Sequence, residues 1–349
     1  MKAKTSRYNL IITMLVIALI FFIGLFTAIG TAKVSVGDIF KIIVSKIPLI
    51  NEQIDLSNIP STSVSIIWNL RLPRVLLGAM VGASLSMAGA TFQGMFKNPM
   101  ADPYVIGISS GAALGAALAI VFRIDLGILG FSTISIFAFG GALLAVSVVY
   151  NIARIKNKVP VTTLLLAGVA VGQFMTAIMS FMMIMSDKDM VKITYWTLGS
   201  LAGKGWEPVL KMSLPSILCM VIIGFYAKDL NILLTGEESA QSLGVDVERT
   251  KRYILLLGTF MTALSVSVGG IIGFVGLIVP HIVRLLVGPD HRILLPASAF
   301  LGAIFMIFAD TLARTLISPI EIPVGIITAL FGGPFFIYLL KTKRKVYRR

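Results

Sequence analysis

Two arginines, Arg71 and Arg74, stand three residues apart directly before a long apolar stretch. A guanidinium is always charged and binds a carboxylate through two parallel hydrogen bonds, so such a pair can orient an acidic partner as well as attract it. The same side chains could instead extend to lipid headgroups and anchor the end of a helix. A third arginine, Arg314, follows Asp310 by four residues, a spacing that favours an ion pair on one helix face. The residue types therefore predict carboxylate binding and leave its partner open.

A second group of charges lies in the segment "LTGEESAQSLGV" at 234–245. Thr235 is a residue type that caps helices, Glu237 and Glu238 would stand in the first turn where the helix dipole favours negative charge, and Gly244 can end the helix. The pattern predicts a short, rigid helix between two apolar segments. A solvated connector without a partner is the alternative interpretation.

Other patterns argue against a nucleotide site, a metal site and a disulfide within this chain. In the segment "GSLAGKG" at 199–205, three residues separate Gly199 from Gly203, and Gly205 follows Lys204. A P-loop needs four residues between its two glycines and a Ser or Thr after the lysine. We therefore expect no ATP to bind this chain. His281 and His291 are the two histidines, ten residues apart, with no cysteine or paired carboxylates at metal-ligand spacing, so we expect no metal and no cofactor. The single Cys219 excludes a disulfide within the chain.

The elements that position these residues are membrane spans. Hydrophobic residues make up 57% of the 349 and charged residues 13%, about half the charged share of a soluble domain. A bilayer core needs roughly 20 apolar residues per helix, and the alternation of a β-barrel is not found. We predict an all-α polytopic membrane protein, a single transmembrane domain over 1–349 with about ten helices in one bundle. The expected spans are 8–31, 72–94, 104–122, 131–151, 161–184, 208–227, 253–272, 274–288, 293–316 and 323–341.

Orientation follows from the basic residues. With the N-terminus inside, 19 of the 30 lysines and arginines, the tail "KTKRKVYRR" among them, fall on the cytoplasmic side, which predicts that both termini are cytoplasmic. The first span could be mistaken for a signal peptide, but its apolar run is longer than a signal h-region, so we interpret it as an uncleaved helix. The net charge of +14 then reflects topology and contact with anionic lipid, and no nucleic-acid partner is expected. The largest cytoplasmic loop is 228–252.

Small residues follow the first two arginines at every fourth position. Such a stripe lets a second helix approach backbone to backbone, which predicts a packing face and not a ligand site. Its members are Gly78, Gly82, Ser86, Ala90 and Gly94.

Four segments carry a family resemblance: "NLRLPRVLLGAMVGASLSMAGATFQGMFKNPMADPYVIGISSGAALG", "LTGEESAQSLGV", "GFVGLIVPHIVRLLVGPDHRILLPASAFLGA" and "ADTLARTLISPIEIPVG". In this order, over about 10–340, the chain resembles the FecCD/BtuC family of ABC-importer permeases, which take up iron-siderophores, haem or vitamin B12. The resemblance implies ten helices per subunit, a second permease subunit, two cytoplasmic ATPase subunits and an extracytoplasmic substrate-binding protein.

The resemblance also implies roles for individual residues. It implies ATPase coupling by Glu237, Glu238, Ala240, Leu243 and Gly244; a cytoplasmic gate near Asn98, Met100, Val161, Thr162 and Thr163; and docking of the binding protein on Arg71, Arg74 and Arg314.

Two other classes of membrane protein are alternatives to the family that this resemblance implies. A secondary transporter usually places carboxylates or unwound helices near the middle of the membrane, and no acidic residue lies at the centre of an expected span. An intramembrane enzyme would need a nucleophile and base or metal ligands, and none assembles. Among substrates we favour an iron-siderophore, because the resemblance implies a family that mostly carries iron-siderophores. Haem and vitamin B12 stay open as alternatives, because the sequence offers no code that separates the three.

Overall fold

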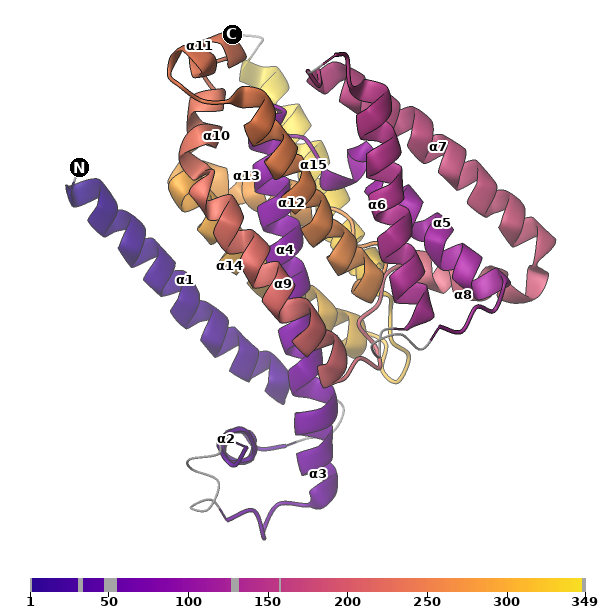
Figure 1. Cartoon of the computed structure of the whole chain (residues 1–349). Coiled ribbons are helices and arrows are strands. Elements are labelled where there is room, and N and C mark those ends of the chain that lie inside the picture. The colour runs from indigo at the N-terminus through magenta and orange to yellow at the C-terminus, as the bar shows by residue number, and fades with distance from the viewer. Residues whose placement is uncertain (1, 31–33, 47–54, 127–131, 157, 347–349) are drawn as a thin grey trace.

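The computed structural model describes residues 2–30, 34–46, 55–126, 132–156 and 158–346. Within these ranges the regular elements are helices, arranged in one bundle (Figure 1). They are α1 (Lys2–Ala28), α2 (Val36–Val44), α3 (Ser61–Ser65), η2 (Ile66–Arg71), α4 (Leu72–Met95), η3 (Pro103–Ile106), α5 (Ile108–Val121), α6 (Thr133–Ala153), α7 (Val161–Met185), α8 (Asp187–Thr197), α9 (Trp206–Phe225), α10 (Ala227–Leu233), α11 (Glu237–Ser242), α12 (Val247–Gly269), α13 (Val275–Val287), α14 (His291–Thr315) and α15 (Val324–Val346).

Seven helical stretches in the described part are long and apolar enough to cross a membrane. Three of the expected spans are shorter there: α5, α13 and the described apolar part of α15 at 324–339. The expected start at residue 72 was wrong, because helical structure runs without a break from Ser61 through a π-helical turn into α4. Some expected positions lie outside the described residues: the end of the first span at 31, the start of the fourth span at 131, and Arg348 and Arg349 of the tail.

The central helix is α4, whose most apolar window is 83% buried. Its small residues meet backbone: a Cβ added to Gly82 would lie 2.2 Å from the carbonyl oxygen of Gly302 in α14. A Cβ added to Gly89 would lie 1.8 Å from the carbonyl oxygen of Gly276 in α13. Close helix approach along this face therefore requires glycine at these positions.

The short helix α5 follows the 3-10 turn η3, and α13 follows irregular backbone. Gly107 (φ 87°) separates η3 from α5, so the expected span 104–122 is shortened to Ile108–Val121. Gly270 (φ 72°) ends α12, so the expected span 253–272 stops at Gly269. The two segments contact each other, since the Tyr104 hydroxyl donates to the carbonyl oxygen of Ile272 at 3.0 Å. Irregular backbone at this depth is tolerated because it is enclosed by protein.

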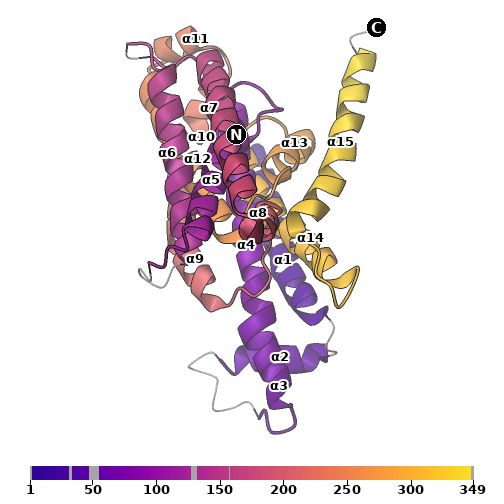
Figure 2. The ribbon, with the colours of Figure 1, turned by 90° about the vertical axis from the view of Figure 1, so that its right-hand side faces the viewer.

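The bundle has two distinct ends. The start of α1, the end of α15 and helices α10 and α11 lie at one end, and α2 and α3 extend from the other (Figure 1). Turned by 90°, the ribbon of α15 leans away from α6 and α7 (Figure 2). Sites at the two ends are therefore separated by the length of the spans.

Candidate functional site

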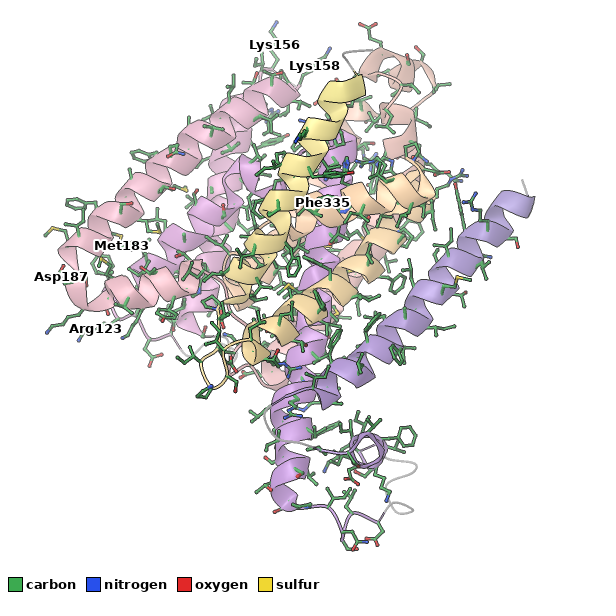
Figure 3. The ribbon with its side chains drawn as sticks, turned by 180° about the vertical axis from the view of Figure 1, so that it is seen from behind. Arg123, Lys156, Lys158, Met183, Asp187 and Phe335 are labelled. Atoms are coloured by element: carbon green, nitrogen blue, oxygen red, sulfur yellow. The ribbon has the colours of Figure 1, made fainter. Side chains whose placement is uncertain are left out.

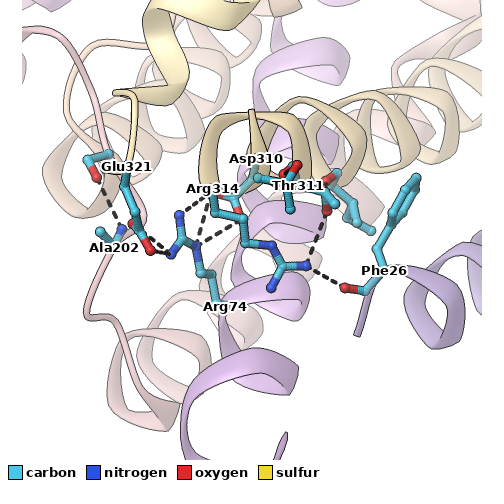
Figure 4. A network of polar contacts seen from close by, with 10 residues as sticks. Phe26, Arg74, Ala202, Asp310, Thr311, Arg314 and Glu321 are labelled. Atoms are coloured by element: carbon cyan, nitrogen blue, oxygen red, sulfur yellow. Dashed lines mark hydrogen bonds and ion pairs between the residues drawn. The ribbon is translucent and has the colours of Figure 1, made fainter. Parts of the chain in front are cut away.

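Arg74 lies at the α2–α3 end, near the start of α4, and its guanidinium contacts two carboxylates. Its Nε is 2.9 Å from Asp310 Oδ2 and its Nη1 is 2.9 Å from Glu321 Oε2 (Figure 4). The arginine thus joins α4 to α14 and to the connection between α14 and α15. The alternative in which Asp310 pairs with Arg314 on one helix face is not what the structure shows, because Asp310 accepts hydrogen bonds from Nε and Nη2 of Arg74 in α4.

Arg71 and Arg314 contact the last turn of α1. The Arg71 Nη1 donates to the carbonyl oxygen of Ala28 at 3.1 Å. Arg314 Nη2 donates to the carbonyl oxygen of Phe26 (Figure 4). A Cβ on Gly30 would lie 2.5 Å from the Arg71 Cζ, so glycine leaves room for this guanidinium. Because the final carbonyls of a helix lack intrahelical partners and carry partial negative charge, the two arginines stabilise the end of α1.

The three arginines are less open than a surface ring would require. Arg71, Arg74 and Arg314 are 6%, 8% and 9% exposed, so the expectation of freely accessible cations is corrected within this chain. They cluster with two carboxylates and the carbonyl end of α1. Glu321 is the accessible member, with its side chain 41% exposed. The cluster keeps an excess of one formal positive charge over its two carboxylates.

At the other end, α10, α11 and the following Leu243 form a packed unit, which we call the α10–α11 unit (227–243). Ala240 is fully buried against Leu233, Val245 and Val247, while Leu243 is 65% exposed. The unit therefore offers an apolar side chain on a rigid base.

The ends of α11 differ partly from prediction. Gly236 stands at the N-cap with φ 126°, and the Thr235 hydroxyl donates to the carbonyl oxygen of Ile232 instead, so the predicted cap was wrong. Gly244 adopts φ 86° just after the helix, where its amide donates to the carbonyl oxygen of Gln241. Glu237 and Glu238 lie in the first turn, as the pattern indicated.

The residues implied for the gate lie at this same end. Asn98 follows α4, and its Oδ1 accepts a hydrogen bond from the amide of Met100 at 2.9 Å. Val161, Thr162 and Thr163 form the first turn of α7, with Thr162 exposed. Lys156 and Lys158, just before α7, are seen at this end in Figure 3, while Met183 marks the far end of α7 and Asp187 begins α8.

Sequence reasoning missed two residues beside α11. Lys251 had been counted only as a loop cation, yet its ammonium is buried and binds Glu237 and Glu248. The signal that was available is the i, i+3 spacing of Glu248 and Lys251 at the start of α12. The contact with Glu237 depends on how α11 folds back and has no local signature.

The chain matches the model of the FecCD transport family over residues 14–342. It is 49% identical over 286 residues to the cobalamin import system permease protein BtuC of Halobacterium salinarum, covering 82% of this chain and 76% of that one. It is 37% identical over 349 residues to the Fe(3+)-citrate import system permease protein YfmD of Bacillus subtilis, covering 99% and 98%. A solved structure described as an inward-facing metal-chelate type ABC transporter matches with TM-score 0.82 and 30% identity, covering 96% and 99%.

Proposed function

The chain belongs to the FecCD transport family and is an ABC-importer permease, and on that premise we propose that it carries an iron-siderophore complex across the cytoplasmic membrane. ATP hydrolysis in a separate subunit drives this transport, and the chain itself is not an enzyme. The observation that carries the proposal is the family match over nearly the whole chain. The α10–α11 unit supports it, because an exposed Leu243 on a packed base is suited to a cleft in an ATPase.

Relatives support the substrate class to different degrees. The names of two of them specify cobalamin and ferric citrate, which are both bulky metal chelates. A metal-chelate transporter is also the description of the matching structure. An iron-siderophore belongs to the same class, and haem and vitamin B12 are the alternatives within the same machinery.

The remaining partners follow from the same proposal. A second permease subunit, a copy of this chain or a paralogue, covers apolar side chains exposed on α7 and α15, of which Phe174 and Ile337 are each 67% exposed. A binding protein docks at the α2–α3 end, where the excess cationic charge of the arginine cluster attracts acidic groups. The α10–α11 end then faces the cytoplasm together with both termini.

Reconstitution tests this function. The permease, its cognate ATPase and its binding protein are placed in proteoliposomes, and uptake of radiolabelled iron-siderophore, haem and cobalamin is compared. We expect ATP-dependent uptake of the siderophore that a protonophore does not abolish. Uptake without ATP that collapses with the ion gradient would instead identify an ion-coupled secondary transporter.

A further inference from the structure

Lys251 is a buried cation at the point where the α10–α11 unit meets α12. The side chain is 8% exposed, and its Nζ is 2.7 Å from Glu237 Oε1 and 3.2 Å from Glu248 Oε1. A buried ammonium is costly unless it is paired, and loss of one partner leaves charge uncompensated. Lys251 therefore ties the first turn of α11 to the first turn of α12.

Glu248 extends this connection to α7. Its Oε2 accepts a hydrogen bond from the amide of Val159 at 3.1 Å. Val159 precedes Pro160, the N-cap of α7, and proline has no amide hydrogen. The hydrogen bond from Glu248 therefore engages the amide of Val159, which is the last backbone donor before α7 begins.

The segment before Val159 is itself closed. Ile155 and Lys158 exchange two backbone hydrogen bonds, of 2.9 and 3.1 Å, so these two residues of the connection from α6 to α7 are held together (Figure 3 labels Lys158). The start of α7 should move with the carboxylate that holds Val159.

We propose that Lys251 and Glu248 are positioning residues that carry movement of the α10–α11 unit to the first turn of α7. The relay runs from Glu237 through Lys251 and Glu248 to the amide of Val159, and it ends beside Thr162. This inference rests on the proposed ATP-driven function, since it assumes that an ATPase moves the α10–α11 unit. It adds the specific contacts through which that movement reaches α7.

The first experiment measures coupling in the reconstituted transporter. Lys251→Met keeps most of the aliphatic stem and removes both ion pairs. We expect receptor-stimulated ATP hydrolysis to stay within about twofold of wild type, while substrate transported per ATP falls about fivefold or more. Glu237→Gln, at a half-exposed position that tolerates change, should reproduce the loss. The double variant should be no worse than Lys251→Met alone, because both changes remove the same Lys251–Glu237 contact.

A second measurement reports the gate directly. Cys219, the one native cysteine, is replaced in Cys219→Ala, and Thr162→Cys is introduced. The rate of thiol labelling at position 162 should change when a nucleotide is trapped in the ATPase, and this change should be lost in Lys251→Met. A purely structural role for Lys251 would alter labelling with and without nucleotide alike.

The control is Lys211→Met, which removes another helix ion pair, with Glu207, at the α2–α3 end of the bundle. It should leave transport per ATP unchanged. Wild-type coupling and wild-type labelling changes in both Lys251→Met and Glu237→Gln would overturn the relay while leaving the proposed function intact. Absence of ATP-driven uptake in the wild type would overturn the function itself, and the relay with it.

Discussion

At the scale of single residues, Glu321 decides how accessible Arg74 is. Both of its carboxylate oxygens accept from Arg74 Nη1, at 2.9 and 3.0 Å, so an acidic group of a binding protein has to displace it. Asp310 holds the other side of the guanidinium and is buried. Direct removal of Arg74 would confuse docking with folding, whereas Glu321 is separable because it is partly exposed.

We therefore predict that Glu321→Gln strengthens binding of the receptor protein to the permease. An exposed pair contributes up to about 1 kcal/mol, so the dissociation constant should fall by up to about fivefold. Titration in nanodiscs at two salt concentrations measures it. Glu207→Gln is the matched control, since it removes a carboxylate that is paired with Lys211 at the same end of the bundle. An equal effect of both changes would indicate general electrostatic attraction, and unchanged affinity would argue against exchange at Arg74.

Asp290 is a second residue with a measurable role. It caps α14, and its carboxylate accepts from Arg292, Asn231 and the Tyr8 hydroxyl of α1. These hydrogen bonds, first that of Arg292, hold the pKa of Asp290 well below its usual range. A depressed carboxylate pKa stabilises the fold above the unfolded pKa and loses its effect as the pH falls through the folded value.

Asp290→Asn should accordingly lower the thermal midpoint at pH 7. The difference from wild type should stay constant between pH 8 and pH 5 and begin to close only below about pH 4, where the unfolded carboxyl takes up its proton. Thermal unfolding in detergent across this pH range checks it. A gap that widens on acidification would have the wrong sign for this mechanism.

At the scale of elements, backbone contact between α4 and α14 sets the centre of the bundle. Gly82→Ala should destabilise the protein by about 1–3 kcal/mol, because the added methyl would overlap the carbonyl of Gly302. Gly140→Ala in α6 is the matched control: no heavy atom lies within 4 Å of its added Cβ, and it should be neutral or stabilising by up to about 1 kcal/mol. Thermal unfolding of both variants decides, and equal stability would refute the close-packing argument.

At the scale of the whole molecule, the distribution of basic residues predicts orientation. The start of α1, the end of α15 and the α10–α11 unit share one end, so one topology fixes all three (Figure 1). Reporter fusions at both termini should report a cytoplasmic location. An external C-terminus would reverse the assignment of coupling and docking ends together.

The sequence by itself determined what depends on local composition. Span length and apolar content are properties of contiguous segments, so the helices could be predicted. The four-residue spacing of small residues is also local, and Gly82, one of its members, meets the backbone of α14. The order of motifs likewise led to the family that the comparison supports over 14–342. Boundaries failed where one backbone angle decided them, as at Gly107 and Gly270.

Only the tertiary structure decided the partners of the charges. Arg74 and Asp310 are 236 residues apart, and Glu248 and the amide of Val159 are 89 apart. A charged side chain in the sequence indicates a need for a partner but not which one, because ion pairing depends on distances that helix packing sets. At Arg314, the nearest charge along the helix, Asp310, is instead paired with Arg74. From the sequence, the three arginines were expected to be accessible. In the structure they bind the end of α1 and two carboxylates, because the fold packs those groups against them.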